Sequence, residues 1–482
     1  MKTGIFVAFS IIFCSLSYSG FSFTDSLRNK KRNQIQIQDT SATVMVNRIL
    51  IIGNKRTREF IIRRELAVTS GDTLTLLQLN QIIEKDKVKL LNTRLFNFTE
   101  CKILNYENGI VDLLWEVNER WYTFPVPIFE LADRNFNEWW ENYNHDFSRV
   151  KYGLNLYQYN VRGRNETLLL NAKLGFTNFF RLNYRIPYLD KKRKQGLIIE
   201  LNLDERKNLA FQTIGNKLDF ASAESTLRLT EYAGLTWTYR NSFYHFHGVT
   251  FDYTTNRVYD SLLLINDTYL GDAGTRKQRY HTLAYQYIYE NRDFVSYPLK
   301  GSYLRTSIKQ KGILPSDDLF KTEFDFHYSR FIDLGKNWYF SSTNVAHVSL
   351  QDDIPYANYS ALGLFRQFLR GYEVYLIEGP QHVYTKTTIK KRIYSKTFQF
   401  DNMRLEQFKK LPINIFLKAY TDFGYVWNYT GYTNGKLLTD QLLSSAGTGL
   451  DITFSYDATL RLEYSINKLN ERGLFIHIRR EF

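Results

Sequence analysis

Alternating apolar and polar residues fill the second part of this chain, from about residue 149 to residue 482. Runs such as Thr167–Phe176 and Phe180–Tyr188 place Leu, Ala, Phe, Tyr or Ile at every second position, with mostly polar residues between them. Successive side chains of a β-strand point to opposite faces, so each run has one apolar and one polar face. Repeated runs of about ten residues predict an all-β transmembrane antiparallel barrel with a polar lumen. This part of the chain is long enough for about sixteen strands and their loops.

The aromatic content favours a membrane barrel over a soluble all-β fold. The chain has 35 Tyr and 36 Phe, and aromatic residues make up 16% of it. Transmembrane barrels use such residues in girdles at both lipid interfaces. A soluble sandwich, the alternative, would have shorter strands whose apolar faces meet in a core. Beyond the N-terminal region no run of roughly 18 apolar residues predicts a membrane helix, and a sheet that spans lipid must close to pair its edges.

The N-terminal region has the features of an export signal followed by a flexible lead-in. Lys2 precedes the apolar stretch Ile5–Leu16, which is too short to span a membrane and is followed by small residues. This pattern predicts a signal peptide over residues 1–22. The polar residues 23–43 predict a flexible segment. Removal of the signal would leave Cys101 as the only cysteine, which excludes an intrachain disulfide.

Residues 44–120 predict one small α/β domain. After a first β-rich run, apolar residues recur at helical spacing in two segments, the second from Leu76 to about Phe96. Two further β-rich runs follow, Thr99–Leu104 and Ile110–Val117. The predicted order is therefore strand, helix, helix, strand, strand (β-α-α-β-β). Residues 121–148 are assigned to a linker that leads into the barrel at residue 149.

Charge and motifs argue against nucleic-acid binding and enzymatic chemistry. The net charge is +14, but Lys and Arg are spread along the alternating runs, where they would line a wet lumen. The sequence contains no nucleophile-elbow, zinc-protease or phosphate-loop motif and no paired-cysteine metal spacing. His245 and His247 share one strand face, but a structural zinc site needs four ligands. We therefore expect no enzyme, no cofactor, no metal site and no nucleic-acid partner.

Several segments resemble the Omp85 superfamily of barrel-assembly and translocation proteins, whose periplasmic modules are called POTRA domains. The unit ending at residue 120 resembles one POTRA domain at Ile49–Asn54, at Leu95-Phe96 and at Val117–Arg120. Residues 150–482 resemble the barrel of the family. The resemblance implies a place in a bacterial outer membrane, with the POTRA-like domain in the periplasm.

The most specific match is Leu369-Arg370-Gly371-Tyr372, which resembles the (Val/Leu/Ile)-Arg-Gly-(Phe/Tyr) signature of the family. In the family this signature lies in the sixth extracellular loop, which folds back into the barrel, and its Arg reaches acidic side chains of the wall. Here it falls in a long segment, about residues 351–382. Val161-Arg162-Gly163 repeats part of the pattern, but it lies in a short hairpin and predicts an ordinary turn.

Strand parity predicts the wall partner of Arg370. The odd positions from Ile413 to Ala419 are apolar, so Lys418 and Asp422 face the lumen. Asp422 matches the wall aspartate of the family, as the resemblance implies. A fork-shaped guanidinium can hold a carboxylate through two hydrogen bonds.

The second acidic partner is not evident from the sequence. Thr388 occupies the place where many members of the family carry Glu. Glu406 and Glu373 are the candidate substitutes.

The end of the chain resembles the terminal strand that outer-membrane barrels present to their assembly machinery. Leu474, Ile476, Ile478 and the terminal Phe482 share one strand face, interrupted by Arg480.

The resemblance implies a function in moving or inserting proteins. The favoured expectation is insertion or folding of outer-membrane barrels, or closely related export, through a seam between residues 149–160 and residues 474–482. A dedicated secretion pore for one partner protein is the alternative, and a passive porin or structural scaffold is the third. Expected partners are outer-membrane lipid and lipopolysaccharide, unfolded outer-membrane or secreted proteins, periplasmic chaperones and accessory lipoproteins. A single POTRA-like domain favours a specialised member of the family.

Overall fold

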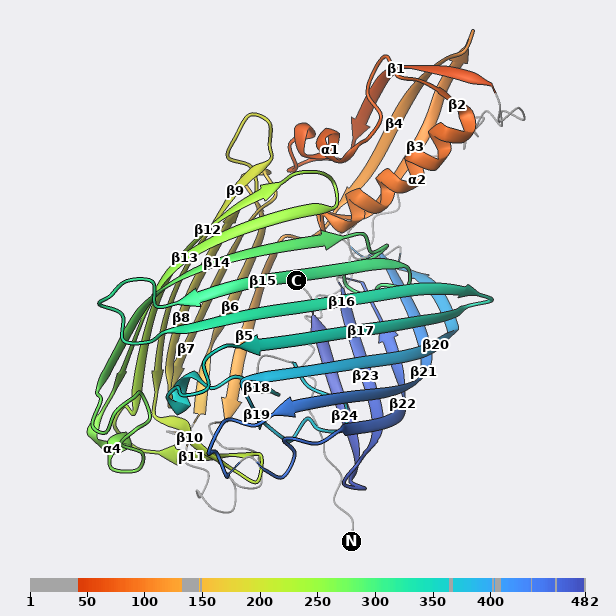
Figure 1. Cartoon of the computed structure of the whole chain (residues 1–482). Coiled ribbons are helices and arrows are strands. Elements are labelled where there is room, and N and C mark those ends of the chain that lie inside the picture. Colours follow the sequence, from red (N-terminus) through yellow and green to blue (C-terminus); the bar gives the residue numbers. More distant parts are fainter. Residues whose placement is uncertain are drawn as a thin grey trace, which may run out of the picture.

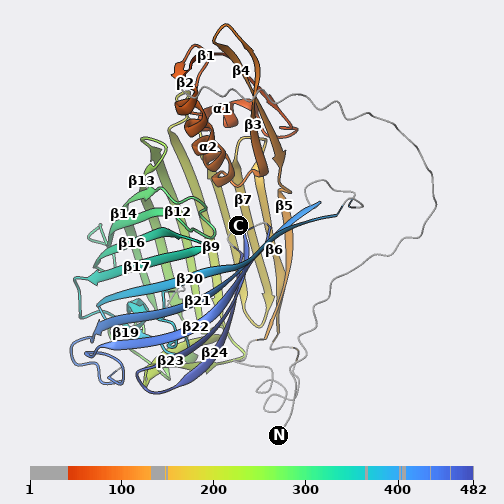
Figure 2. The same ribbon diagram turned by 90° about the vertical axis from the view of Figure 1, so that its right-hand side faces the viewer.

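The computed structural model describes residues 42–131, 147, 150–363, 367–400, 403, 409–434, 436–455 and 457–480 (Figures 1 and 2). The predicted signal peptide and nearly all of the predicted lead-in lie outside these residues. The described chain forms a small α/β domain and a large curved sheet (Figure 1). Within the described parts, no helix is both long and apolar enough to cross a membrane.

The small domain has two helices and a four-stranded sheet. In chain order its elements are β1 (Thr43–Ile52), α1 (Glu59–Glu65), β2 (Thr73–Thr75), α2 (Leu76–Asn92), β3 (Phe96–Glu107) and β4 (Ile110–Glu119). The strand order in the sheet is β2-β1-β4-β3, with β1 parallel to β4. The predicted order of strands and helices is confirmed, and the structure adds the short strand β2 between the helices.

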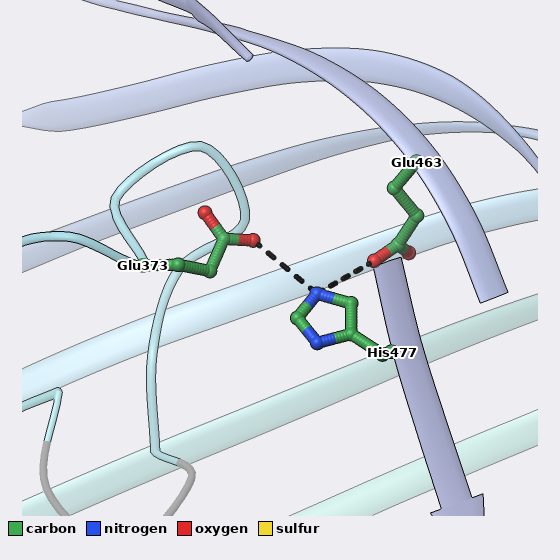
Figure 3. Close-up of side chains that lie close together, drawn as sticks. All are labelled: Glu373, Glu463 and His477. Carbon is green, nitrogen blue, oxygen red and sulfur yellow. Dashed lines mark ion pairs between the residues drawn. The ribbon is translucent and has the colours of Figure 1, made fainter. Parts of the chain in front are cut away.

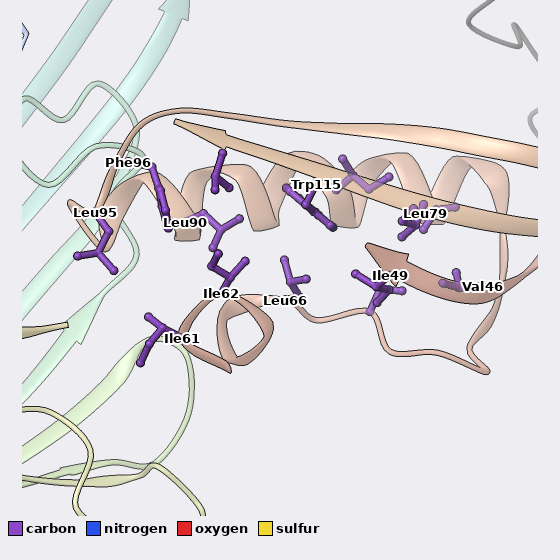
Figure 4. Close-up of a cluster of buried hydrophobic side chains, with 14 of the residues drawn as sticks. Val46, Ile49, Ile61, Ile62, Leu66, Leu79, Leu90, Leu95, Phe96 and Trp115 are labelled. Carbon is purple, nitrogen blue, oxygen red and sulfur yellow. The ribbon is translucent and has the colours of Figure 1, made fainter. Parts of the chain in front are cut away.

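The core of this domain forms between the helices and the sheet (Figure 4). Helix α2 places Leu79, Ile83 and Leu90 on one buried face, at the spacing that the sequence shows. Trp115 of β4, only 1% exposed, packs into the same core. Tyr188, which follows a strand of the large sheet, is also part of this core. The two units therefore share buried apolar surface.

The two helices begin differently. Thr75 and Gln78 form a capping box that starts α2, since each side chain accepts a hydrogen bond from the backbone N–H of the other residue. Helix α1 starts after Arg58 without a side-chain cap. The preceding residue, Thr57, places its hydroxyl 3.1 Å from that of Tyr122.

The large sheet has sixteen strands, each antiparallel to its neighbours and arranged in chain order, as predicted. They are β5 (Thr123–Leu131), β6 (Val150–Val161), β7 (Glu166–Gly175), β8 (Asn178–Ile186), β9 (Gln195–Arg206), β12 (Arg228–Arg240), β13 (His245–Val258), β14 (Lys277–Glu290), β15 (Gly301–Lys311), β16 (Lys321–Gly335), β17 (Trp338–Ser349), β20 (Gln381–Gln399), β21 (Lys410–Trp427), β22 (Leu443–Thr453), β23 (Ala458–Asn467) and β24 (Arg472–Arg480). The sheet curls into a barrel (Figures 1 and 2). The hairpin β10 (Asn208–Ile214) and β11 (Lys217–Ser222) and the short helix α4 (Asp260–Leu263) belong to connections between these strands.

The faces of the strands alternate as the sequence predicts. On β21, Leu417 and Phe423 are 51% and 46% exposed, whereas Lys418 and Asp422 are 5% and 0% exposed. The apolar side chains thus lie on the outer, lipid-facing surface and the charged ones lie inside.

The first strand of the barrel lies earlier in the chain than the sequence analysis places it. β5 falls within residues 121–148, which were assigned to a linker, and the run that starts near residue 149 is the second strand, β6. Pro125 and Pro127 argue against a strand at this place in the sequence. Proline has no N–H and is tolerated in sheets mainly at free edges.

The two edges of the sheet are β5 and β24, and no backbone ladder joins them in the described residues. The seam therefore lies between β5 and β24 rather than beside residues 149–160. The carbonyl of Tyr122 accepts a hydrogen bond from the N–H of Tyr159 at 2.7 Å, and bonded residues alternate along an antiparallel strand. Phe124 and the other even residues of β5 therefore direct their N–H groups toward β6. Pro125 and Pro127 face the free edge.

The α/β domain packs on one rim of the barrel through the turns between strands. Glu65, at the end of α1 and 2% exposed, accepts two hydrogen bonds from Arg240 at the end of β12, at 2.6 and 2.8 Å. Between β6 and β7, the carbonyl of Gly163 accepts from the N–H of Arg58 at 3.0 Å. A Cβ on Gly163 would lie 2.1 Å from the carbonyl oxygen of Arg56, so only glycine fits this contact. The partial signature at residues 161–163 is thus a turn, as the sequence predicts, and it also contacts the α/β domain.

Two further contacts hold the same rim. Asn92, the last residue of α2, donates to the carbonyls of Arg292 and Asp293, between β14 and β15, at 3.2 and 3.0 Å. Arg120 pairs with Asp457, between β22 and β23, at 2.7 Å. The domain is therefore attached to well-separated turns of the barrel, which fixes its orientation.

Candidate functional site in the barrel lumen

The connection between β17 and β20 folds into the barrel. This inward loop (residues 350–380) is described except at residues 364–366, and it contains the hairpin β18 (Ala361–Leu362) and β19 (Ile377–Glu378). It is the sixth strand connection on the rim away from the α/β domain. Its apolar side chains pack with wall residues in one buried cluster of Val345, Leu362, Leu369, Tyr372, Tyr375, Ile377, Tyr384, Val426, Leu438 and Leu443.

Arg370 of the inward loop binds Asp422 of the wall strand β21. Nε donates to Oδ2 at 2.8 Å, Nη2 donates to Oδ1 at 2.5 Å, and the backbone N–H donates to Oδ2 at 3.1 Å. The guanidinium also lies 3.8 Å from the ring centroid of Tyr420. Arg370 is 8% exposed and Asp422 is 0% exposed. A forked pair in such a place is strong, and removal of either partner would leave an uncompensated buried charge.

Thr388 and Glu463 complete the surroundings of Arg370. Nη1 donates to the hydroxyl of Thr388 on β20 at 3.0 Å and lies 4.0 Å from Oε1 of Glu463 on β23. Thr388 thus supplies a neutral oxygen where the resemblance led us to expect an acidic group. Glu463 supplies the second carboxylate.

Glu463 is not among the partners predicted from the sequence. Of the two predicted substitutes, Glu373 lies beside His477 instead of Arg370, and Glu406 lies outside the described residues. The signal was nevertheless present in β23, where the polar Arg461, Glu463 and Ser465 alternate with Leu460, Leu462 and Tyr464. Glu463 thus lies on the lumenal face of β23 by the same strand parity that places Asp422 on the lumenal face of β21.

The other residues of the signature fit the loop to the wall. Gly371 has a φ of +84°, and a Cβ there would lie 3.2 Å from the Cβ of Ser465, so glycine is favoured by both conformation and space. Its carbonyl accepts a hydrogen bond from Asn467 at 2.9 Å. Leu369 and Tyr372 are 0% and 1% exposed. All four residues of the signature therefore hold the inward loop against the barrel wall.

A charged network extends from Arg370 toward the α/β domain. Lys418 donates to Glu463 at 2.7 Å and to Asp451 of β22 at 2.5 Å. Asp451 accepts a hydrogen bond of 2.8 Å from the hydroxyl of Tyr297. Tyr297 belongs to the turn between β14 and β15 that Asn92 of α2 holds. The network thus connects the inward loop with the opposite rim of the barrel.

A second group of hydrogen bonds anchors the base of the inward loop. Lys321 donates to the carbonyl of Asn358 at 2.9 Å and to the hydroxyl of Ser360 at 2.7 Å. His347 contacts the same hydroxyl at 2.9 Å and Asp325 at 2.8 Å. The Asp–His–Ser arrangement resembles that of a hydrolase, but Lys321 also donates to Ser360, which is 8% exposed. We therefore interpret the group as an anchor.

The terminal strand presents apolar side chains to the outside. Leu474 and Ile476 of β24 are 69% and 61% exposed. Ile478 also lies in β24, whereas its side chain and Phe482 lie outside the described part of the chain.

These features define an outer-membrane β-barrel with a periplasmic domain and a lumenal loop. The model of the Omp85 superfamily domain matches residues 160–473, and a POTRA model, described as a surface antigen variable number repeat, matches residues 44–120. The chain belongs to the Omp85 superfamily, whose members assemble proteins in, or translocate them across, the outer membrane. The barrel accordingly lies in the outer membrane and the POTRA domain in the periplasm.

Solved structures with a similar fold include two barrel proteins. BamA from Haemophilus ducreyi, lacking POTRA domains 1–3, matches with a TM-score of 0.50 and 16% identity over 90% of this chain and 84% of that one. CdiB from Escherichia coli matches with a TM-score of 0.54 and 10% identity over 90% of this chain and 75% of that one. At these identities the likeness shows a shared fold. No curated protein sequence matches the chain significantly.

Proposed function

We propose that this protein folds or inserts other barrel proteins at the outer membrane by pairing their strands with its own edges, β5 and β24. The observation that carries the proposal is that these two edges have no ladder between them among the described residues. A free edge offers backbone N–H and C=O groups, to which an extended segment of almost any sequence can add. Membership of the superfamily supports assembly or translocation as the general task.

The inward loop supports this proposal because it is bound to the strands next to the edge. Arg370 joins the loop to β21 and approaches β23, and Asn467 at the end of β23 binds Gly371. Such a tether would keep the C-terminal part of the wall rigid while β24 separates from β5.

The POTRA domain would act as the receiver for incoming chains. Its outer strands, β2 and β3, are themselves sheet edges on the periplasmic side. We propose unfolded outer-membrane or secreted proteins as substrates, with periplasmic chaperones and accessory lipoproteins as partners and lipid and lipopolysaccharide around the barrel. The proposed activity requires no covalent chemistry and no cofactor.

A dedicated secretion pore for one partner is the second candidate, and a passive porin or scaffold is the third. Conductance separates them, because a pore must open whereas an insertase keeps its lumen filled by the inward loop. Depletion of the protein separates them again. An insertase should lower the amounts of several outer-membrane barrels, whereas a dedicated pore should stop the export of one protein.

Disulfide locking of the seam tests the proposed mechanism. Phe129→Cys combined with Leu474→Cys or Ile476→Cys places thiols on the outer faces of β5 and β24, where these residues are 70%, 69% and 61% exposed. We expect oxidation to stop barrel insertion and reduction to restore it.

The control is a disulfide inside the wall. Leu304→Cys and Tyr328→Cys lie opposite each other on β15 and β16, so their disulfide would leave the seam free. Activity should survive this lock. Full activity with the seam itself locked would contradict the mechanism.

A further inference from the structure

Glu373, Glu463 and His477 converge from three separate segments of the chain (Figure 3). Glu373 belongs to the inward loop, Glu463 to β23 and His477 to the edge strand β24. Nε2 of His477 lies 3.8 Å from Oε1 of Glu373 and 3.5 Å from Oε2 of Glu463. One potential ligand atom from each residue lies within 4.8 Å of the other two. The three residues thus surround one point in the lumen.

Several polar atoms around this point are buried without a hydrogen-bond partner among the described residues. Both carboxylate oxygens of Glu373 and Nε2 of His477 are in this state. The side chain of Glu373 is 11% exposed and that of Glu463 is 5% exposed. Buried polar atoms are normally paired, and a buried carboxylate is normally neutralised or bound to a cation. The described part of the chain therefore supplies no hydrogen-bond donor to the carboxylate of Glu373.

The charged residues nearby also favour a cation at this point. Arg370 pairs with Asp422, and Lys418 pairs with Asp451, which offsets these four charges. Lys418 also pairs with Glu463 at 2.7 Å, and Arg461 lies 3.9 Å from Asp451, so three cations face four carboxylates. The carboxylate of Glu373 is left as one excess negative charge, which would attract a cation.

Neighbouring side chains also orient the potential ligands. Lys418 occupies Oε1 of Glu463, which leaves Oε2 for the shared point. The ring of Phe368 stacks on that of His477 at 5.6 Å and 21°. Such outer contacts typically hold metal ligands in place.

We propose that Glu373, Glu463 and His477 form a site for a divalent metal ion. One imidazole nitrogen and two carboxylate oxygens best match Zn²⁺, with Mn²⁺ a weaker fit. Zinc bonds of about 2.0–2.2 Å place tetrahedral ligand atoms roughly 3.4 Å apart, close to the two separations above. The third separation, between the two carboxylates, is within 4.8 Å and would have to shorten by at most about 1.4 Å. Three protein ligands leave one coordination position for water or substrate.

The metal would connect the inward loop directly to the edge strand. Glu373 follows the signature by one residue, and His477 lies on β24, one of the two strands at the seam. Bound metal would therefore restrain β24 against the loop. The site does not depend on whether the protein inserts barrels or secretes a partner.

Metal content of the full chain tests the proposal. The protein would be purified in detergent without a histidine tag, stripped with EDTA, reloaded with Zn²⁺ and passed over a sizing column before elemental analysis. Binding of Mn²⁺, followed by electron paramagnetic resonance, provides a second reading. We expect the original chain to retain about one Zn²⁺, and Glu373→Gln and His477→Gln to bind it at least about tenfold more weakly.

The control is His245→Gln, which removes a histidine of β13 whose Nδ1 lies 2.7 Å from the hydroxyl of Tyr287. It should bind zinc as well as the original chain. Every variant must show the shift in gel mobility on heating that marks a folded barrel, so that loss of metal is not loss of fold. Zinc should also raise the unfolding temperature of the original chain but not that of Glu373→Gln. Equal zinc binding by all four proteins, or none by the original chain, would overturn the proposal, the latter leaving a protonated His477 as the bridge between the carboxylates.

Discussion

Tyr297 and Asp451 share a hydrogen bond of 2.8 Å, although Tyr297 lies in a periplasmic turn and Asp451 faces the lumen from β22. The turn that carries Tyr297 is itself held by Asn92 of the POTRA domain. The same carboxylate binds Lys418, which binds Glu463 near Arg370. The POTRA domain and the inward loop are thus joined through a short series of contacts.

Tyr297→Phe should weaken this connection without changing the packing of the ring. The substitution keeps the ring contact with Phe416, at 4.9 Å between centroids, and removes only the hydroxyl. A hydrogen bond to a charged group contributes about 1.5–3 kcal/mol. We expect a loss of this size in the free energy of unfolding, measured with denaturant. Tyr394→Phe, at a residue that is 40% exposed, should have almost no effect.

Arg370→Ala and Asp422→Ala should each destabilise the barrel or impair its function. Breaking a buried pair costs about 3–5 kcal/mol because one charge is left without a partner. The double variant should lose less than the sum of the two single losses. Arg370→Lys should rescue only in part, because an ammonium cannot form the fork. Unfolding midpoints and assays of barrel insertion would measure these effects.

Arg257→Ala is the control for this tether. The side chains of Arg257 on β13 and Glu231 on β12 are 49% and 46% exposed and pair at 3.4 Å. Exposed pairs contribute about 0–1 kcal/mol. A loss as large as that of Arg370→Ala, or strict additivity of the Arg370 and Asp422 defects, would contradict the tether.

Arg240→Ala should loosen the POTRA domain from the barrel. Glu65 would lose two hydrogen bonds but keep Arg64, 3.1 Å away, so we expect the low end of the usual cost, about 3 kcal/mol. Faster hydrogen–deuterium exchange in α1 would report the change. Lys87→Ala, which removes a pair with the 71% exposed side chain of Glu84, should leave that exchange unaltered.

Cys101 should report whether the POTRA domain is folded. Burial in the domain raises the pKa of its thiol to about 12. The folded chain at pH 8 therefore holds roughly one thiolate in ten thousand, far fewer than an unfolded chain with a thiol pKa of about 8.5. Maleimide labelling should be slow in the full chain and fast in denaturant. The isolated fragment of residues 44–120 should label faster than the full chain, because its core loses Tyr188 and its Glu65 loses Arg240.

The sequence predicts the features that follow from periodicity. The alternation of apolar and polar residues predicts which face of β21 lies in the lumen, and so the position of Asp422. The family resemblance predicts the role of Arg370. Helical spacing gave the buried face of α2. Each of these patterns depends on residues that are close together in the chain, so no tertiary information is needed.

Other features depend on segments far apart in the chain. Glu65 and Arg240 are separated by 175 residues, and the burial of Glu65 arises only when the two units dock. Glu373, Glu463 and His477 come from three segments with no common spacing. β5 escaped prediction for a different reason, because its two prolines are unfavourable in a strand interior and acceptable only at an edge, and the edge is a property of the finished sheet.

The prolines of β5 also make the two ends of the seam unequal in the number of hydrogen-bond donors that they offer. Pro125 and Pro127 occupy successive donor positions on the free edge, about 7 Å apart, in the half of β5 nearer the POTRA domain. A strand lying against that half finds carbonyl acceptors but no donors at either position, and each missing bond is worth about 0.5–1.5 kcal/mol. Beyond Pro127, the N–H groups of Phe129 and Leu131 are intact. We therefore expect β5 and β24 to separate first at the periplasmic end of the seam. The opening between them would then face the periplasm, from which unfolded chains arrive in the proposed function.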